Sequence, residues 1–132
     1  MAMPPKPTDA ELAVLRVLWE LGPSTVREVH DHMAGDRSVA YTTTLKTLQV
    51  MTSKGLTLRE DLRGQHVYRP VQNEDVTQRR LVKHLLTHAF GGSTSKLVLQ
   101  ALATQPASAE ELREIKRLLN QAGALEKKRP KS

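Results

Sequence analysis

Five polar side chains at helical spacing are the residues of this sequence best suited to binding chemistry. At about 100° per residue, Thr42, Thr43, Lys46, Gln49 and Ser53 fall within roughly a third of a helix circumference. They supply short hydroxyls, one amide and one ammonium, and no carboxylate. Hydroxyls can approach phosphates and base edges, a Thr methyl can meet a thymine methyl, and a Gln amide can pair with adenine. The pattern indicates contact with DNA; the alternative interpretation is an ordinary exposed, Thr-rich helix.

Arginines on a predicted β-hairpin supply a second set of candidate contacts. Arg63 is expected at the tip of the hairpin, and Arg59 and Arg69 along its strands. Their guanidinium groups can straddle a neighbouring phosphate backbone or enter the minor groove. The alternative is that they are solvated surface arginines.

The sequence offers little for catalysis or for a bound cofactor. It contains no cysteine, which excludes disulfides, thiolate metal sites and cysteine nucleophiles. His84 and His88 are spaced i, i+4 and could form half of a metal site, but no third ligand is suggested nearby. The sequence shows no glycine-rich phosphate loop and no nucleophile with a plausible base. We therefore expect no enzyme activity, no metal and no cofactor.

Three helices are predicted to position the polar side chains. Thr8 and Glu11 form a capping-box pattern that opens a helix over residues 9–21. Ser24 or Thr25 can cap a short second helix, which should end near residues 34–36.

The third helix carries the candidate DNA contacts. It should run from residues 40–42 to Lys54, with Gly55 at its C-terminal cap. Leu45, Leu48 and Met51 fall on the side opposite the polar residues and are expected to face the core.

After the third helix the apolar period changes from helical to two. Leu56 and Leu58 alternate with polar residues, Arg63 and Gly64 supply a turn, and Pro70 ends a second strand. Three helices followed by a hairpin within about 70 residues are typical of a winged helix-turn-helix.

The second half of the chain is predicted to be helical and to need a partner. Helices are expected over residues 74–90 and 95–103, and a last one should begin at Ser108 with Glu111 as its capping partner. These helices have no matching core of their own, so a second copy of the chain is the simplest partner. The basic segment from residue 122 is expected to be disordered.

The expected fold class is therefore mainly α with a small β-hairpin: a winged helix-turn-helix followed by a C-terminal helical dimerisation segment. The predicted domains are an N-terminal arm over 1–7, a DNA-binding domain over 8–72, a dimerisation domain over 73–121 and a basic tail over 122–132.

Charge and hydropathy agree with a DNA-binding protein. The net charge of +6 and the isoelectric point of about 9.9 favour a polyanionic partner. Half of this excess lies in the last ten residues, where four Lys or Arg stand against one Glu. Since no apolar run approaches the length of a membrane span and the N-terminus lacks a signal-peptide pattern, we expect a cytoplasmic protein without membrane insertion.

Six separated landmarks, in order and at compatible spacing, resemble the penicillinase repressor family of winged-helix transcriptional repressors. The likeness covers about residues 7 to 120 and is carried by Pro7-Thr8-Asp9-Ala10-Glu11, Trp19-Glu20 with Gly22-Pro23, Thr25-Val26-Arg27-Glu28-Val29, Ala40-Tyr41-Thr42-Thr43, Lys54-Gly55-Leu56 and Tyr68-Arg69-Pro70.

The resemblance implies a homodimer that binds a palindromic operator in double-stranded DNA and represses a neighbouring operon, often answering to a membrane metalloprotease sensor. The residues expected to contact DNA are then Ser24, Thr25, Tyr41, Thr42, Thr43, Lys46, Gln49, Ser53, Lys54, Arg59, Arg63 and Arg69. The residues expected at the dimer interface are Leu85, Leu86, Phe90, Leu97, Val98, Leu102, Leu112, Ile115 and Leu119; their alternative is a core within one chain.

The chain departs from the family pattern at several positions. The family usually has an apolar residue at Thr44, Thr at Lys46 and Arg at Val50, so no operator preference is carried over. The bond that is cut in some members aligns with Gln100-Ala101, a different residue pair. The C-terminal cysteines of copper-responsive members are missing, which excludes a copper sensor of that type.

Two other functions remain open from the sequence. One is a regulator on the same fold that responds to a small molecule; the low aromatic content of 3% argues against an elaborate pocket. The other is a winged-helix module that binds proteins and never DNA. Acidic or apolar residues on the outer face of the third helix would favour the second alternative, and the sequence has Thr42, Thr43, Lys46 and Gln49 there.

Overall fold

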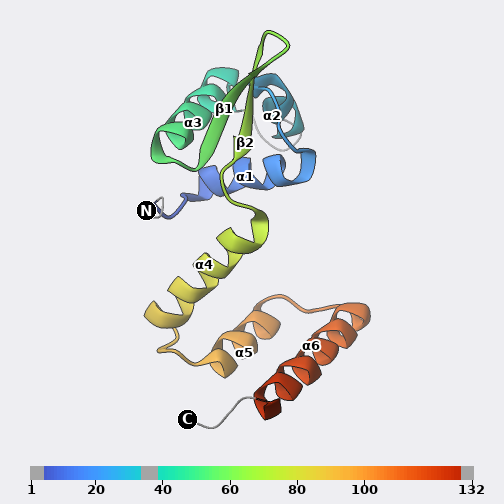
Figure 1. Cartoon of the computed structure of the whole chain (residues 1–132). Helices are drawn as coiled ribbons and strands as arrows, with labels where there is room; N and C mark the ends of the chain where they lie inside the picture. The colour runs from blue at the N-terminus through green and yellow to red at the C-terminus, as the bar shows by residue number, and fades with distance from the viewer. Residues whose placement is uncertain (1–4, 34–38, 129–132) are drawn as a thin grey trace. The chain divides into compact units, whose positions relative to one another are not determined.

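The structure, a computed structural model, describes residues 5–33 and 39–128. The chain divides into two compact units, Met1–His84 and Leu85–Ser132. Within the described residues, six helices and one antiparallel hairpin confirm the expected mainly α class (Figure 1). The elements are α1 (Asp9–Leu21), α2 (Val26–Met33), α3 (Tyr41–Lys54), β1 (Thr57–Leu62), β2 (Gln65–Pro70), α4 (Glu74–His88), α5 (Thr94–Thr104) and α6 (Ala109–Lys128).

Reciprocal capping boxes begin α1 and α2, as the sequence predicts. The Thr8 hydroxyl accepts from the Glu11 N–H at 3.2 Å, and the Glu11 carboxylate accepts from the Thr8 N–H at 2.9 Å. Thr25 and Glu28 repeat the arrangement at α2, with distances of 3.1 and 2.9 Å. Each box satisfies backbone donors that a helix N-terminus leaves without partners. The predicted end of the second helix, near residues 34–36, lies outside the described residues.

Helix α3 ends where Gly55 takes a left-handed conformation. Its φ of 84° is readily adopted by glycine, and the Gly55 N–H donates to the carbonyls of the last turn. The chain thereby reverses and enters β1 two residues later.

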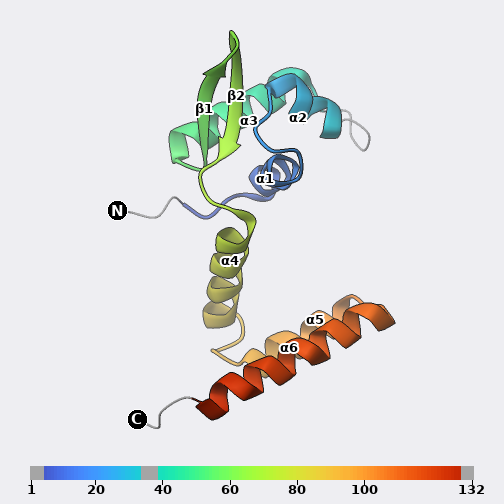
Figure 2. The same cartoon turned by 45° about the vertical axis from the view of Figure 1, so that its right-hand side comes forward.

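The hairpin is held against the helices by a short third strand segment. Strands β1 and β2 pair antiparallel from Thr57 opposite Pro70 to Leu62 opposite Gln65. Ser24, between α1 and α2, forms an isolated antiparallel bridge with Tyr68 of β2 through hydrogen bonds of 2.8 and 3.0 Å. The base of the hairpin is therefore fixed, while its tip extends beyond the helices (Figures 1 and 2).

The core of the first unit is aliphatic and lies where the three helices and the hairpin meet. Helix α1 supplies four of its ten buried residues, the largest share, and the others come from α2, α3, β2 and the residue after Gly55. Trp19 is only partly buried, and its indole N–H donates to the Gln72 carbonyl at 3.1 Å. The buried cluster comprises Val14, Leu15, Val17, Leu18, Val26, Val29, Leu48, Met51, Leu56 and Tyr68.

The second unit consists of the end of α4 together with α5 and α6. Ser93 caps α5 and Ser108 opens α6, each accepting from a backbone N–H three residues later. Helix α6 continues to Lys128, so the expectation of disorder is wrong for residues 122–128. Ala122, Ala124 and Leu125 are good helix formers, and the single Gly123 between them does not end the helix. Residues 129–132 lie outside the described part.

None of the helices in the described ranges combines the length and the apolar character of a membrane span.

Candidate nucleic-acid interface

The outer face of α3 is polar and exposed, as the sequence predicts. Thr42, Thr43, Lys46, Gln49 and Ser53 are all exposed. On the opposite side Leu48 and Met51 are fully buried, while Leu45 is partly buried. The packing of α3 onto α1 and α2 thus fixes which side chains point outward.

An ion pair between a half-buried Lys54 and a buried Glu11 joins the end of α3 to the start of α1. Lys54 Nζ donates to Glu11 Oε2 at 2.8 Å, and the Glu11 side chain is 5% exposed. Burial raises the pKa of Glu11, but hydrogen bonds from Lys54 and Thr8 and the charge of Lys54 outweigh it, so the pKa lies below its ordinary value. The ammonium group of Lys54 is therefore paired with the Glu11 carboxylate, which argues against the predicted contact of Lys54 with DNA.

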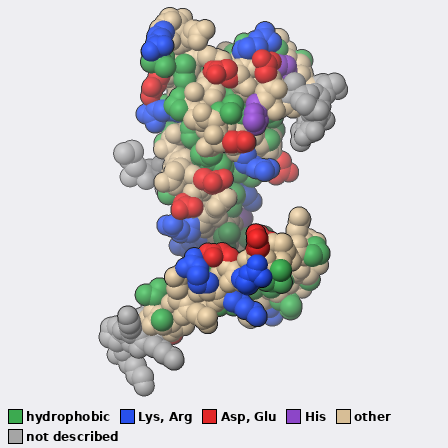
Figure 3. All heavy atoms as spheres, turned by 90° about the vertical axis from the view of Figure 1, so that its right-hand side faces the viewer, with side chains coloured by type: hydrophobic (Ala, Val, Ile, Leu, Met, Phe, Trp, Pro, Cys, Tyr) green, Lys and Arg blue, Asp and Glu red, His purple; other side chains and the backbone are tan. Residues whose placement is uncertain are grey.

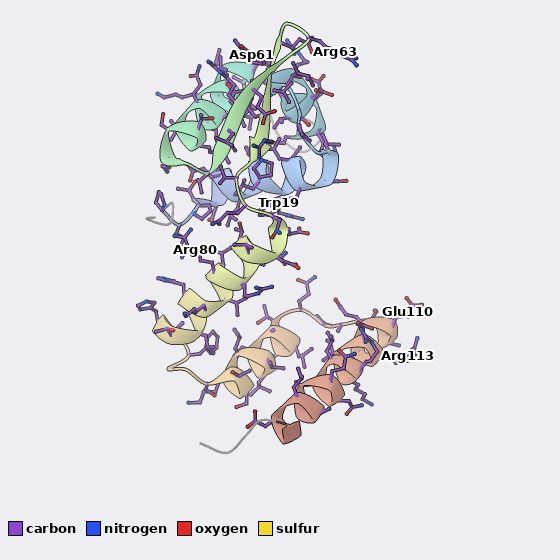
Figure 4. The ribbon with its side chains drawn as sticks, viewed as in Figure 1. Trp19, Asp61, Arg63, Arg80, Glu110 and Arg113 are labelled. Atoms are coloured by element: carbon purple, nitrogen blue, oxygen red, sulfur yellow. The ribbon has the colours of Figure 1, made fainter. Side chains whose placement is uncertain are left out.

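The hairpin brings Arg59 next to Gln49. Both side chains line a hollow of about 410 Å³ between α3 and the strands. Among the described residues, no carboxylate partner is recorded for Lys46, Arg59 or Arg63. Arg63 projects from the hairpin tip (Figure 4).

The carboxylates of the hairpin are paired within the hairpin. Arg69 donates to Glu60 at 2.5 Å across the strands, and His66 contacts Asp61 at 2.5 Å. Arg69 is half-buried in this pair, so it is a weaker candidate for DNA contact than Arg59 or Arg63. The pairing also reduces the repulsion that a phosphate backbone would meet near the tip.

Arg27, which the sequence pattern did not single out, lies over the ring of the predicted site residue Tyr41. The Arg27 guanidinium carbon is 4.5 Å from the centre of the Tyr41 ring, within the range of a cation–π contact. His30 meets the same ring edge-on at 5.6 Å between centroids. Arg27 is exposed on α2, and Tyr41 is the first residue of α3. The contact therefore places a cation beside the N-terminus of α3. The Arg27-Tyr41 spacing alone gives no signal of this contact.

Two predicted contact residues have structural roles instead. The Ser24 side chain is buried and donates to the Gly22 carbonyl at 2.8 Å, which argues against its predicted contact with DNA. The Thr25 hydroxyl is the N-terminal cap of α2 and is half-buried. Both residues fix the connection that carries α2, and neither belongs to the exposed face of α3.

The predicted dimerisation residues lie on an apolar surface of the second unit. No side chain from Leu85 to Glu126 is buried. Leu99, Leu118 and Leu125, which the prediction did not include, are exposed by 62%, 49% and 68%. Hydrophobic side chains are visible on the surface of this unit in Figure 3. Of the nine predicted residues, Leu85, Val98, Leu102, Leu112 and Leu119 are exposed, and Leu86, Phe90, Leu97 and Ile115 are partly buried.

Comparison with known sequences gives one family. The sequence profile of the penicillinase repressor family matches residues 7–121. Two proteins named transcriptional regulator BlaI, from strains CDC 1551 / Oshkosh and ATCC 25618 / H37Rv of Mycobacterium tuberculosis, are each 34% identical over 92 residues. The match covers 69% of this chain and 67% of each relative.

Solved structures with a similar fold include a complex with DNA. The solution structure of monomeric Bacillus licheniformis BlaI with the blaP half-operator matches with a TM-score of 0.50 and 25% identity, over 57% of this chain and 92% of that chain. A MarR family protein from Bacillus stearothermophilus matches with a TM-score of 0.53 and 21% identity, over 92% of this chain and 76% of that chain. The second likeness shows the fold alone. Both structures agree with the winged-helix architecture of the first unit.

Proposed function

This chain belongs to the penicillinase repressor family of DNA-binding transcriptional repressors, and from that premise we propose that it acts as a homodimer on an inverted-repeat operator. In the proposal α3 enters the major groove and the hairpin contacts the adjacent backbone or minor groove. Its relatives are transcriptional regulators rather than enzymes.

The outer face of α3 is the observation that carries the proposal. An exposed helix normally mixes Glu with Lys, whereas this face has one Lys, one amide and three hydroxyls. The carboxylate of Glu11, which lines a groove together with Thr43 and Lys46, is held by Lys54. A surface of this kind suits phosphates and base edges, and it disfavours the alternative of a protein-binding module without DNA.

The apolar surface of the second unit supports the homodimer. Large exposed leucines on α5 and α6 need a partner that removes them from water. A second copy presents the same surface, and a two-fold dimer buries both at once. The α3 helices of the two copies, which are proposed to read the base sequence, would then face half-sites about one DNA turn, or a multiple of a turn, apart.

Selection of bound sequences from a random duplex pool tests the proposal. We expect an inverted repeat, and titration of that repeat at two salt concentrations should give a steep loss of affinity with salt, because each phosphate contact releases counterions. Recovery of no common sequence, with weak binding at low salt only, would exclude the operator-binding function.

A signal is proposed to release the repressor, with a membrane metalloprotease sensor as its source in keeping with the family. The aligned bond Gln100-Ala101 lies inside α5, so cleavage there needs local unwinding of this helix. Mass spectrometry of the protein from induced cells checks this step. Intact repressor at full induction would show that release occurs without cleavage.

A regulator that responds to a small molecule is the second candidate. A hollow of about 570 Å³ in the first unit is lined by Trp19, Met33, Arg16 and the hydrogen-bonded pair Glu20 and His32. It is large enough for a small ligand, although the low aromatic content of the sequence argued against an elaborate pocket. Loss of operator binding on addition of a metabolite, without cleavage, would favour this candidate.

A further inference from the structure

The exposed face of α3 also carries one apolar side chain, that of Val50, which the function proposed above does not use. Val50 is 38% exposed although it lies on the helix that carries the candidate DNA contacts. It lines a groove of about 420 Å³ between α3 and the start of α1, together with Thr43, Lys46 and Thr47. The other lining residues are Thr8, Ala10, Glu11 and Thr42.

The hydroxyl of Thr47 uses its only proton within the helix, so it has none to donate to a ligand. Its Oγ1 donates to the Thr43 carbonyl at 2.9 Å, one turn earlier in the helix. Beside this hydroxyl Thr47 carries a methyl group, and Val50, which lines the same groove, carries two. Two neighbouring positions of the reading helix thus present hydrocarbon where the others present donors and acceptors.

The charge around these methyl groups is compatible with DNA. The only carboxylate that lines the groove is that of Glu11, which is buried and paired with Lys54. Lys46, on the other side, is exposed and can reach a phosphate or a guanine edge. A DNA strand lying along this groove would meet a cation and methyl groups, and no exposed carboxylate among the described residues that line it.

We propose that Val50 and the methyl group of Thr47 form a specificity contact that recognises the 5-methyl group of thymine in the major groove. Among the four bases only thymine carries a methyl group on that edge, so an apolar side chain there distinguishes thymine from cytosine without a hydrogen bond. The inference rests on the proposed function, because it assumes that α3 enters the major groove.

Replacement of thymine by uracil isolates this contact. Deoxyuridine removes only the methyl group and leaves the base pair intact. In the operator recovered by selection, each thymine is replaced in turn, symmetrically in both half-sites, and affinity is measured by titration. We expect one position at which the wild-type protein loses affinity about fourfold per half-site, the value of one buried methyl group.

The Val50→Ala variant should remove that sensitivity. It should bind the thymine operator more weakly than the wild type does. The variant should bind the uracil operator as well as it binds the thymine operator, so the loss from the Val50→Ala change and the loss from uracil are not additive. Val50 is exposed and Ala favours helix, so the variant should fold. Val71→Ala is the matched control, since Val71 is 44% exposed but lies beyond the hairpin, and it should keep the full uracil effect.

The outcomes separate the two claims. If selection yields an operator and no uracil position changes the affinity of the wild type, or if Val50→Ala responds to uracil as the wild type does, the methyl contact is wrong and the repressor function stands. If selection yields no operator, the proposed function fails and this inference fails with it.

Discussion

At the scale of single residues, hydrogen bonds within the fold decide which threonines of α3 keep a hydroxyl proton that they can donate to DNA. Thr44 is buried and bonds His30 Nδ1 at 3.1 Å, and Thr52 donates to the Leu48 carbonyl at 2.9 Å. Among the described residues no partner is recorded for the hydroxyls of Thr42 and Thr43. These two are therefore the threonines best placed to bond a phosphate or a base edge.

Substitutions on this face should change sequence preference rather than overall charge attraction. Thr43→Ala or Gln49→Ala should cost about 1–3 kcal/mol on the selected operator and much less on random DNA. Paired titrations on the two duplexes measure the difference. Equal losses on both would mean that α3 is not the reading helix. Gln78→Ala, at an exposed position of α4, is the control and should change neither affinity.

The Glu11–Lys54 pair should make stability depend on pH. Since the pKa of Glu11 in the folded state is below its ordinary value of 4.5, its contribution is fully present above that pH and is lost as the pH falls through the folded pKa. Lys54→Met should reduce the free energy of unfolding at pH 7 by about 1–3 kcal/mol, because a buried carboxylate loses its partner. Without Lys54, only the hydrogen bonds of Thr8 oppose the effect of burial, so the pKa of Glu11 should be higher than in the wild type and the deficit should shrink on acidification.

Denaturant unfolding at pH 7 and near pH 4 checks this expectation. Lys46→Met is the matched control: Lys46 is exposed on the same helix, and its loss should change stability by less than about 0.5 kcal/mol. A deficit of Lys54→Met that is the same at both pH values would show that the pair is not what stabilises this junction.

At the scale of elements, the hairpin carries a cation in a strained position. Arg63 has a φ of 53° and Gly64 a φ of 80°, which is the two-residue turn that suits the twist of a hairpin. Asn or Gly adopts the first position easily, whereas Arg does not. The presence of Arg where Asn would be more stable is explained if its charge contacts DNA.

Arg63→Asn should therefore separate stability from function. We expect the free energy of unfolding to rise by about 0.5–1 kcal/mol and the affinity for DNA to fall similarly on specific and random duplexes, with a smaller salt dependence. Arg63→Lys, which keeps both the charge and the strain, should preserve affinity and gain no stability. If Arg63→Asn bound DNA as well as the wild type, the tip of the hairpin would not contact the backbone.

At the scale of the whole molecule, the two units are stabilised in different ways. The first has a buried core of its own, whereas the second has no buried side chain over its described residues and several exposed leucines. A partner surface can supply the burial that the second unit lacks within one chain. Oligomerisation and the stability of α5 and α6 should consequently be linked.

Leu119→Asp should yield a monomer in sedimentation while leaving the first unit folded. Leu119 is 59% exposed in the isolated chain, so the change costs little there, but it places a charge in the proposed interface. Arg113→Asp, on another face of α6, is the control and should remain a dimer. A dimeric Leu119→Asp variant would show that the interface lies elsewhere.

The sequence by itself determined the elements and their order, because the signals that define them are local. The capping boxes at Thr8 and Thr25, Gly55 after α3 and the turn at Arg63-Gly64 act over three or four residues and need no tertiary contact. Helical periodicity likewise identified the polar face of α3. The same local signals left the end of α6 unpredicted, because a polar, basic composition does not exclude a helix.

Only the tertiary structure decided which of the predicted site residues are free to act. Ser24 is buried by its bridge to Tyr68, Lys54 is held by Glu11 forty-three residues away, and Arg27 is brought over Tyr41. These contacts join residues distant in sequence, and their partners depend on how α1, α2, α3 and the hairpin pack. The physical reason is that a charged or hydroxyl group bonded to a partner within the fold is less available to a ligand. The packing of the elements determines which side chains have such a partner within bonding distance.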